Sequence, residues 1–265
     1  MLESMRAAMA KDRQPYEPDW ESCADYVKPD MYWRNGKTAN DGFRARSKIV
    51  NPTPAASLNV MQAGLFSGTA NPTRSWFRIQ HPDPQLNKDQ QVKTWLAEVH
   101  DRMQNVMIRS NLYKALPRLF SQLGLFGIGA IVVVDDSQDT IRFHNRMVGQ
   151  FWVANDARGN IGTYMEEQHM SVRQVVETFG LKQCSDRVKQ LWNTNHKESI
   201  VKVCWSVEKN KEYDPNKLQA KFKKYRSTYW EKGATNEGGL LSLSGVDMFN
   251  VIVPRWELNG NDPYG

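Results

Sequence analysis

The spacing of apolar residues predicts a helical first half of the chain. The pattern is clearest over residues 88–109, where an apolar residue recurs every three or four positions between charged ones, as in an amphipathic helix. Residues 1–28 carry a weaker helical pattern that two prolines interrupt. A further helix is predicted over residues 111–126, in which Pro117 marks a kink or a new start.

Another helix is predicted over residues 53–66, where bulky side chains share one face and small residues lie between them. Small residues let a neighbouring helix approach closely, so we expect tight packing there. Gly68 is expected to end this helix, because glycine adopts a left-handed backbone at little cost. The preceding residues, 30–48, predict an exposed loop with a basic end.

Beyond Gly129 the pattern becomes that of β-strands. A β-branched run over residues 130–134 ends in two aspartates, which predicts a strand and a turn, and Phe143 lies in the expected hairpin partner. Ser171 and Gln174 have the spacing of a capping box, which predicts the start of a helix. Further strands are expected over residues 151–154, 163–169, 200–207, 223–230, 240–243 and 249–253.

The order of these elements predicts an α+β fold, in which N-terminal helices precede a mostly antiparallel sheet. The sequence indicates a boundary between two portions of the chain at residues 127–129, a segment that begins and ends with glycine. We therefore expect a helical N-terminal portion over residues 1–128 and a strand-rich α+β portion over residues 129–265.

Composition restricts the class of protein that this chain can be, but it does not identify a function. The chain has 265 residues, 40% of them hydrophobic, and a net charge of +6, so it is expected to fold around a core. The charge is equally compatible with nucleic-acid binding and with simple solubility. Three cysteines without metal-ligand spacing favour a reducing compartment. No apolar run approaches the ~20 residues of a membrane helix, so no membrane contact is expected.

The search for catalytic motifs finds none. The chain lacks a phosphate-binding loop and a zinc-protease motif, and its histidines are scattered singly. Glu166 and Glu167 are adjacent in a predicted strand and should point to opposite faces. We interpret them, like Asp135 and Asp136, as turn or surface residues and not as metal ligands. The prediction is a protein that is not an enzyme and holds no metal or cofactor; an enzyme with an unusual site ranks last.

One segment, residues 209–226, is a candidate for nucleic-acid binding. It has seven basic residues against two acidic ones, with three aromatic side chains among them, and such a surface can follow a phosphate backbone. The alternative, which we favour, is an exposed hairpin whose lysines protect a strand edge from aggregation. The candidate nucleic-acid-facing residues are Lys217, Lys221, Lys223, Lys224 and Arg226.

A collinear set of short motifs resembles the podovirus head-to-tail connector, or portal, family. Each motif is weak alone, and their order along the chain makes the resemblance specific. The strongest is the closing motif at residues 253–257. The motifs are Pro18–Asp19–Trp20 with Asp25 and Tyr26; Gly64–Leu65, Ser67–Gly68, Pro72 and Trp76–Phe77; Arg109–Ser110–Asn111 with Tyr113; Asn155–Asp156 with Gly159; and Val253, Pro254, Arg255, Trp256 and Glu257 followed by Gly260, Asp262, Tyr264 and Gly265.

The resemblance implies the outer, wing-like part of a subunit that assembles as a ring of twelve at one capsid vertex. It implies a channel for DNA packaging and ejection, and docking sites for the packaging terminase and for tail or adaptor proteins. Capsid and scaffolding proteins are further implied partners, double-stranded DNA passes through the channel, and the protein is expected in the virion and, during assembly, in the host cytoplasm. The stem, clip and crown would follow residue 265, so we expect Gly265 to interrupt a longer polypeptide.

A ring requires two different contact faces on each subunit, and interface cores are rich in tryptophan and methionine. The candidate interface residues are therefore Trp33, Trp76, Phe77 and Trp152. For Trp95 and Trp256 we favour ordinary core packing. The rival hypothesis, a separate nucleic-acid-binding module, predicts strong and salt-dependent DNA binding, whereas a DNA channel should hold DNA loosely.

Overall fold

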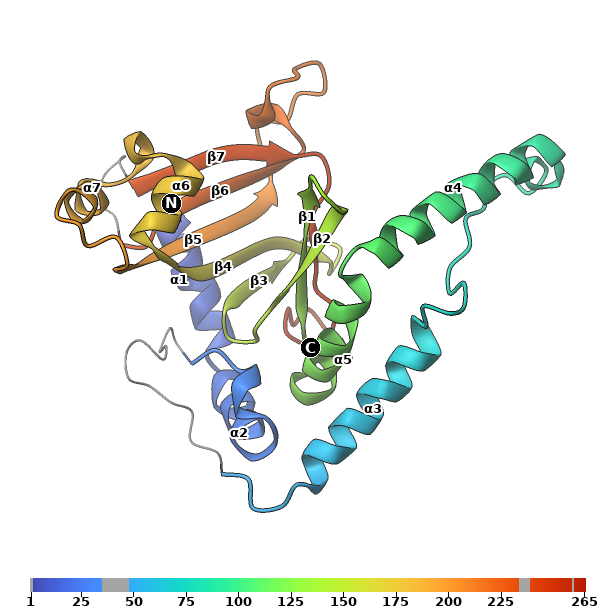
Figure 1. Ribbon diagram of the computed structural model, residues 1–265, viewed down its shortest axis with the longest axis horizontal. Helices are drawn as coiled ribbons and strands as arrows, with labels where there is room; N and C mark the ends of the chain where they lie inside the picture. The colour runs from blue at the N-terminus through green and yellow to red at the C-terminus, as the bar shows by residue number, and fades with distance from the viewer. Residues whose placement is uncertain (1, 35–47, 234–238, 259) are drawn as a thin grey trace.

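Two antiparallel sheets lie at the centre of the molecule in a computed structural model that describes residues 2–34, 48–233, 239–258 and 260–265 (Figure 1). One sheet has the strand order β2-β1-β8 and the other the order β3-β4-β5-β6-β7. The α+β prediction is confirmed. The strands are β1 (Ala130–Asp136), β2 (Thr140–Arg146), β3 (Phe151–Asn155), β4 (Ile161–Ser171), β5 (Ile200–Lys209), β6 (Tyr225–Glu231), β7 (Leu240–Val246) and β8 (Val251–Ile252).

The helices begin and end close to the predicted positions. Asp89 caps α4 by accepting from the backbone N–H groups of Gln91 and Val92, and the predicted capping box of Ser171 and Gln174 opens α6. The helices are α1 (Leu2–Arg13), α2 (Glu17–Val27), α3 (Thr53–Thr69), α4 (Gln90–Arg109), α5 (Leu112–Phe126), α6 (Val172–Phe179) and α7 (Asp186–Asn193), with short 3-10 turns η1 (Pro29–Met31), η3 (Leu86–Lys88), η4 (Leu181–Gln183) and η5 (Ala220–Phe222).

Two predictions about the helices need comment. Gly68 does not end α3, which continues to Thr69, and Ala70 takes the C-terminal position, where its N–H group bonds to the Phe66 carbonyl. The prediction was wrong because a glycine in an exposed turn can stay helical at modest cost. Most of the loop predicted over residues 30–48 lies outside the described residues.

The main hydrophobic core joins the helices to both sheets. Trp20 of α2 and Phe126 of α5 pack in one cluster with Val132 of β1, Val153 of β3 and Trp205 of β5. The indole of Trp20 donates to the Phe126 carbonyl at 3.1 Å. The cluster therefore holds residues from both sides of the boundary predicted at residues 127–129. The division into two portions stays a prediction.

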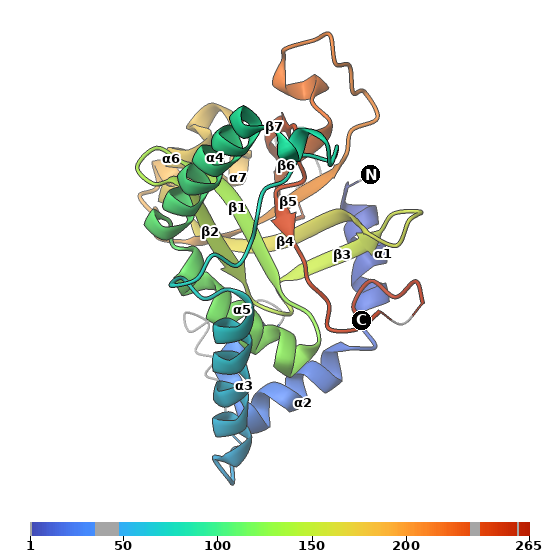
Figure 2. The same ribbon diagram turned by 90° about the vertical axis from the view of Figure 1, so that its right-hand side faces the viewer.

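The C-terminal segment returns to the beginning of the chain, as Figure 2 shows for the red coil that ends near α1 and α2. Tyr264 is 1% exposed, and its ring lies 5.3 Å from that of Tyr16 and 5.5 Å from that of Trp20. Arg255 anchors the segment by donating to Asn155 Oδ1 at 3.0 Å and to the carbonyl of Gly159 at 3.0 Å. The segment that contains Arg255 and Tyr264 thus packs over the main core, and we call it the C-terminal clasp.

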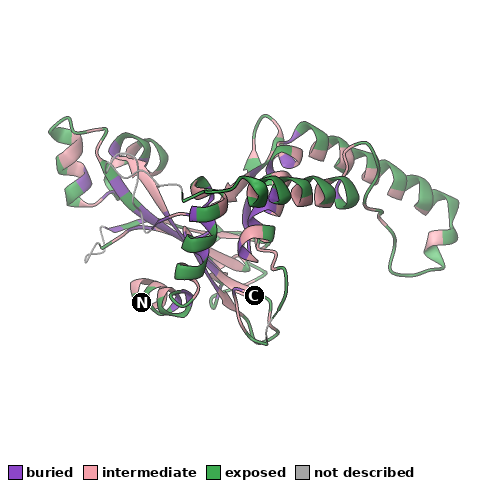
Figure 3. Ribbon diagram, turned by 90° about the horizontal axis from the view of Figure 1, so that it is seen from below, coloured by how far each residue is buried: buried purple, intermediate pink, exposed green. Residues whose placement is uncertain are grey.

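Helices α3 and α4 form a projecting arm, which we define as residues 53–109 including the segment between them (Figures 1 and 3). The only buried residue of α3 is Leu58, and α4 has none. The base of the arm is held where α3 packs on α5. Most residues of the arm are thus exposed or half-buried, although the sequence of the arm is rich in apolar residues.

The two adjacent glutamates of β4 are buried, so their interpretation as surface residues was wrong. They do point to opposite faces: Glu166 bonds to Arg146 and Tyr164, whereas Glu167 bonds to His169 and Lys232. Each carboxylate has charged or hydroxyl partners, which is the condition under which ionised groups are found in protein interiors.

Candidate subunit interfaces and nucleic-acid surface

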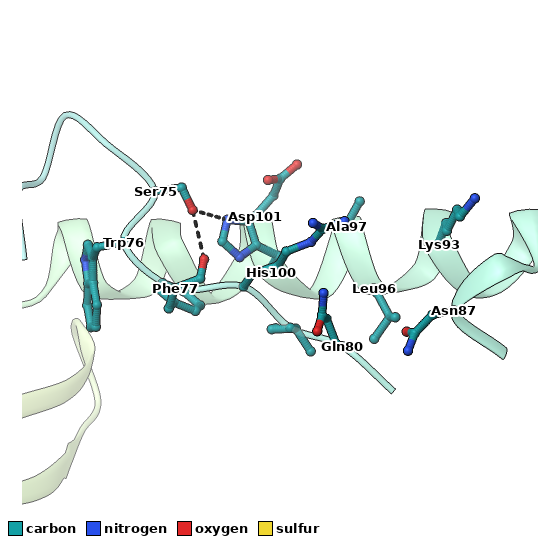
Figure 4. A pocket seen from close by; sticks show the side chains of 12 residues that line it. Ser75, Trp76, Phe77, Gln80, Asn87, Lys93, Leu96, Ala97, His100 and Asp101 are labelled. Carbon is teal, nitrogen blue, oxygen red and sulfur yellow. Dashed lines mark hydrogen bonds between the residues drawn. The ribbon is translucent and has the colours of Figure 1, made fainter. Parts of the chain in front are cut away.

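The interface candidates Trp76 and Phe77 lie side by side in the extended segment of the arm. Their ring centroids are 5.0 Å apart, and the Phe77 ring lies 4.7 Å from that of His100 in α4. The Trp76 indole donates to Tyr113 Oη at 3.2 Å, which ties the segment to α5. With part of α4 these residues line a hollow of about 660 Å³ (Figure 4). Trp76 is 41% exposed, so this aromatic pair presents an open surface.

A serine and a histidine meet in this hollow, but they are not arranged as a nucleophile and its base. Ser75 Oγ lies 3.0 Å from His100 Nε2 (Figure 4), and the same hydroxyl donates its proton to the Phe77 carbonyl at 3.0 Å. His100 Nε2 therefore donates to Ser75 Oγ. Among the described residues, His100 Nδ1 has no hydrogen-bond partner, so no carboxylate orients the ring as in a catalytic triad.

The other two interface candidates, Trp33 and Trp152, line a second hollow of about 500 Å³ between α1 and the five-stranded sheet. Trp33 is half-buried and meets the His169 ring edge-on at 5.0 Å. Trp152 is buried, and the guanidinium of Arg13 lies 4.7 Å from its ring centroid. The Trp152 ring is therefore already covered by its own chain, whereas Trp33 keeps accessible surface. Subunit contact at both positions stays a prediction.

Most charges around this second hollow have partners within the chain. Arg13 is 2% exposed and donates to two backbone carbonyls at 2.7 Å each. Burial raises the pKa of Glu167, but hydrogen bonds from His169 and Lys232 outweigh burial and lower that pKa to about 2. Within the described residues, Arg6, Arg13 and Lys232 of this hollow are therefore held in ion pairs.

The five candidate nucleic-acid-facing residues all lie in or beside the projecting connection between β5 and β6 (Figure 1). Asn210 organises this connection: its Nδ2 group donates to the carbonyls of Lys221 and Lys223 at 2.8 and 2.7 Å, and its Oδ1 accepts from the Glu212 N–H at 3.0 Å. Asn210 is buried, so the connection is folded around an amide whose hydrogen bonds are satisfied.

Several of these cations have partners within the chain. Lys217 and Lys223 pair with aspartates at 3.3 and 2.9 Å, and the amino groups of Lys217 and Lys221 lie 4.3 and 4.7 Å from the Phe222 ring centroid. Exposed pairs of this kind contribute about 1 kcal/mol or less, so they leave the lysines able to meet a phosphate. Contact with nucleic acid at these residues stays a prediction.

Two tryptophans that we interpreted as core residues are on the surface. Trp95 in α4 is 61% exposed and Trp256 in the closing motif is 56% exposed, so both interpretations were wrong. An apolar stripe shows which side of a helix is apolar, but not which molecule covers it. The absence of any charged residue from α3 was the signal that the arm carries an unusual surface.

Within the part of the chain that the structure describes, no group of three His, Cys, Asp or Glu side chains is placed to hold a metal ion. In that same part, no helix is both long and apolar enough to cross a membrane. The three cysteines are unbonded, Cys23 exposed and the other two buried, and burial raises the pKa of the Cys204 thiol to about 12. A thiol of such high pKa is inert as a nucleophile.

The exposed apolar side chains of the arm, among them Trp95 and Met103, are of the kind that mark a site of contact with another molecule. The chain belongs to the family described as bacteriophage head to tail connecting protein, whose model matches residues 1–265. It is 37% identical over 258 residues to the portal protein of Salmonella phage epsilon15, covering 97% of this chain and 46% of that protein. It is 31% identical over 265 residues to the probable portal protein of Bordetella phage BPP-1, covering 100% of this chain and 48% of that protein. The chain thus spans about half the length of the curated relatives it matches.

Proposed function

We propose that this chain is part of a structural subunit of a ring-shaped portal at a capsid vertex, through which DNA enters and leaves the head. The observation that carries the proposal is the family match over the whole chain, with two phage portal proteins among its relatives. The arm adds physical support, because its exposed apolar side chains, such as Trp95, are stabilised when another molecule covers them.

The proposed partners follow from that position in the virion. The ring, of twelve subunits, would contact capsid and scaffolding proteins during assembly in the host cytoplasm. The packaging terminase and then tail or adaptor proteins would dock on it, and double-stranded DNA would pass through it. In this proposal the chain catalyses no reaction, which agrees with the Ser75 and His100 geometry described above.

A second candidate function is a nucleic-acid-binding module that uses residues 209–226. It is supported by the projection of five basic residues around the connection between β5 and β6. The family match over the whole chain favours the portal function over it, whereas the weak exposed pairs of Lys217 and Lys223 are compatible with either function.

Native mass spectrometry of the complete gene product, with negative-stain imaging, tests the proposal. A closed ring of about a dozen subunits with a central hole is the expected result, since identical head-to-tail contacts close into rings. A stable monomer or dimer that binds DNA tightly at moderate salt would reject the portal function and favour the nucleic-acid-binding module.

A further inference from the structure

The hollow beside α4 has an aromatic end, which Trp76, Phe77 and His100 form (Figure 4). The Phe77 and His100 ring centroids are 4.7 Å apart, and the Trp76 ring, 5.0 Å from that of Phe77, belongs to a residue that is 41% exposed. The Trp76 indole donates to Tyr113 Oη at 3.2 Å, which holds the indole in one orientation. This end therefore presents a fixed aromatic surface on which another flat ring can stack.

Two cations that line the same hollow are available to a ligand. Within the described residues, neither Arg78 nor Lys93 forms an ion pair, and both residues are exposed. Lys93 precedes His100 by two turns of α4, so it lies about 10 Å from His100 along the helix. Figure 4 shows Lys93 at the opposite end of the hollow from Trp76. Guanidinium and ammonium groups without a partner can bind the oxygens of a phosphate group.

The size and lining of the hollow restrict the class of ligand. Its volume of about 660 Å³ lies within the roughly 300–1,000 Å³ of sites for small organic molecules. Leu96 and Ala97 line it between the aromatic end and Lys93. Asp101, also in the lining, follows His100 and can accept a hydrogen bond from an N–H group of a ring. The matching ligand has a flat ring with N–H groups at one end and an anionic group at the other.

We propose that this hollow binds a nucleotide, with the base stacked on Trp76 and the phosphate held by Arg78 and Lys93. Sites for single-stranded nucleic acid combine the same two elements, aromatic side chains under the bases and cations along the phosphates. In a duplex, the neighbouring base pairs cover each base face, so double-stranded DNA does not present this ligand. The ligand is therefore a free nucleotide or one nucleotide of a single strand, which share this chemistry.

Calorimetric titration of the complete gene product with deoxyadenosine monophosphate tests the proposal. We expect saturable binding of one nucleotide per copy of the chain. Deoxyadenosine, which lacks the phosphate, and inorganic phosphate, which lacks the base, should each bind at least about tenfold more weakly, because each keeps only one of the two kinds of contact. Nucleoside or phosphate that binds as tightly as the nucleotide would overturn this arrangement.

Removal of the two cations gives a matched comparison. Arg78→Gln with Lys93→Gln changes two exposed residues and should weaken nucleotide binding by about tenfold or more, because hydrogen bonds between charged groups are lost. Lys88→Gln is the control, since it removes a cation of the same arm that does not line the hollow. This control should bind the nucleotide as tightly as the parent does.

Trp76→Ala tests the stacking surface, and Tyr113→Phe is its control. Loss of the indole should weaken nucleotide binding by about fivefold or more, because the base no longer stacks. Tyr113→Phe removes only the oxygen that accepts from the Trp76 indole and keeps the ring, so we expect a smaller loss. Equal losses from the two variants would overturn the assignment of Trp76 as the stacking surface.

A short adenine single strand, measured by fluorescence anisotropy, distinguishes the two sources of the nucleotide. A strand that binds more tightly than the mononucleotide identifies the ligand as part of a nucleic acid. In that case, the double substitution of Arg78 and Lys93 should lower the slope of log affinity against log salt by about 0.7, the value for one phosphate contact in a single strand. Equal affinities for the strand and the mononucleotide identify a free nucleotide as the ligand.

The site lies within one copy of the chain, so its test is independent of the ring proposed above. Absence of saturable binding for both the mononucleotide and the single strand overturns the proposed site. Binding that the double substitution of Arg78 and Lys93 leaves unchanged also overturns it. Either result leaves the portal function standing, because that function is tested by the assembly of rings.

Discussion

Arg146 Nε donates to Glu166 Oε2 at 2.7 Å and joins the two sheets of the molecule. Arg146 is the last residue of β2, in the three-stranded sheet, and Glu166 lies in β4 of the five-stranded sheet. The Glu166 side chain is fully buried, and Tyr164 donates to the same oxygen at 2.7 Å. Burial and the neighbouring Glu166 charge raise the pKa of Tyr164 well above its ordinary value, so its hydroxyl remains a donor. This buried ion pair therefore ties the two sheets together.

Removal of Arg146 should destabilise the fold strongly. Arg146→Met leaves Glu166 buried without its cation, and we expect the free energy of unfolding to fall by about 3–5 kcal/mol in urea denaturation. Arg173→Met is the control, because its pair with Glu198 is exposed and should contribute about 1 kcal/mol or less. Equal losses from the two variants would contradict a structural role for the buried pair.

The stability of the fold should decrease in acid through Glu167. Its folded-state pKa of about 2 lies below the ordinary value of 4.5, so the ionised form is favoured by folding. The resulting stabilisation is complete above about pH 5 and is lost as the pH falls toward 2. Urea denaturation at a series of pH values should show a shallower acid slope for Glu167→Gln than for the parent. Glu177→Gln, exposed on α6, should keep the parent slope; a parent slope in Glu167→Gln would contradict this assignment.

Tyr264 should hold the C-terminal clasp mainly by packing. Tyr264→Ala removes a ring that is 1% exposed between Tyr16 and Trp20, and we expect a loss of about 3–5 kcal/mol in the free energy of unfolding. Tyr264→Phe loses only the hydrogen bond accepted from the Val153 N–H at 3.3 Å, a loss of about 0.5–1.5 kcal/mol. A loss from Tyr264→Phe as large as that from Tyr264→Ala would show that the hydrogen bond, and not packing, holds the clasp.

The basic connection between β5 and β6 should contribute little to DNA affinity. Lys221→Ala with Lys224→Ala should weaken binding of a short duplex by less than about threefold, because a channel that binds DNA loosely makes few lasting phosphate contacts. Fluorescence anisotropy over a range of salt concentrations measures this effect. A drop of about 0.9 in the slope of log affinity against log salt for each lysine removed would favour the nucleic-acid-binding module.

Local structure could be predicted from the sequence wherever it depends on neighbouring residues. The capping box of Ser171 and Gln174 and the hairpin around Phe143 were both predicted, because each depends on residues close along the chain. The basic connection near Lys221 was also predicted as part of an exposed hairpin, from its run of lysines between two predicted strands. Such features need no knowledge of the rest of the fold.

Features that depend on distant parts of the chain could not be predicted. Trp152 lies under Arg13, 139 positions away in the sequence, and the burial of Glu166 depends on a strand of the other sheet. Trp95 shows a different limit: its place in an apolar stripe was correctly recognised, but Trp95 itself is 61% exposed in the described chain. The pattern of one helix does not specify what, if anything, covers its apolar side.

A cryo-electron microscopy reconstruction of the complete gene product would show whether this chain is part of a subunit of a closed ring. The expected result is a ring of about a dozen copies around a central hole, with the two sheets and the C-terminal segment of this chain recognisable in each copy. Monomers, dimers or open filaments would contradict it.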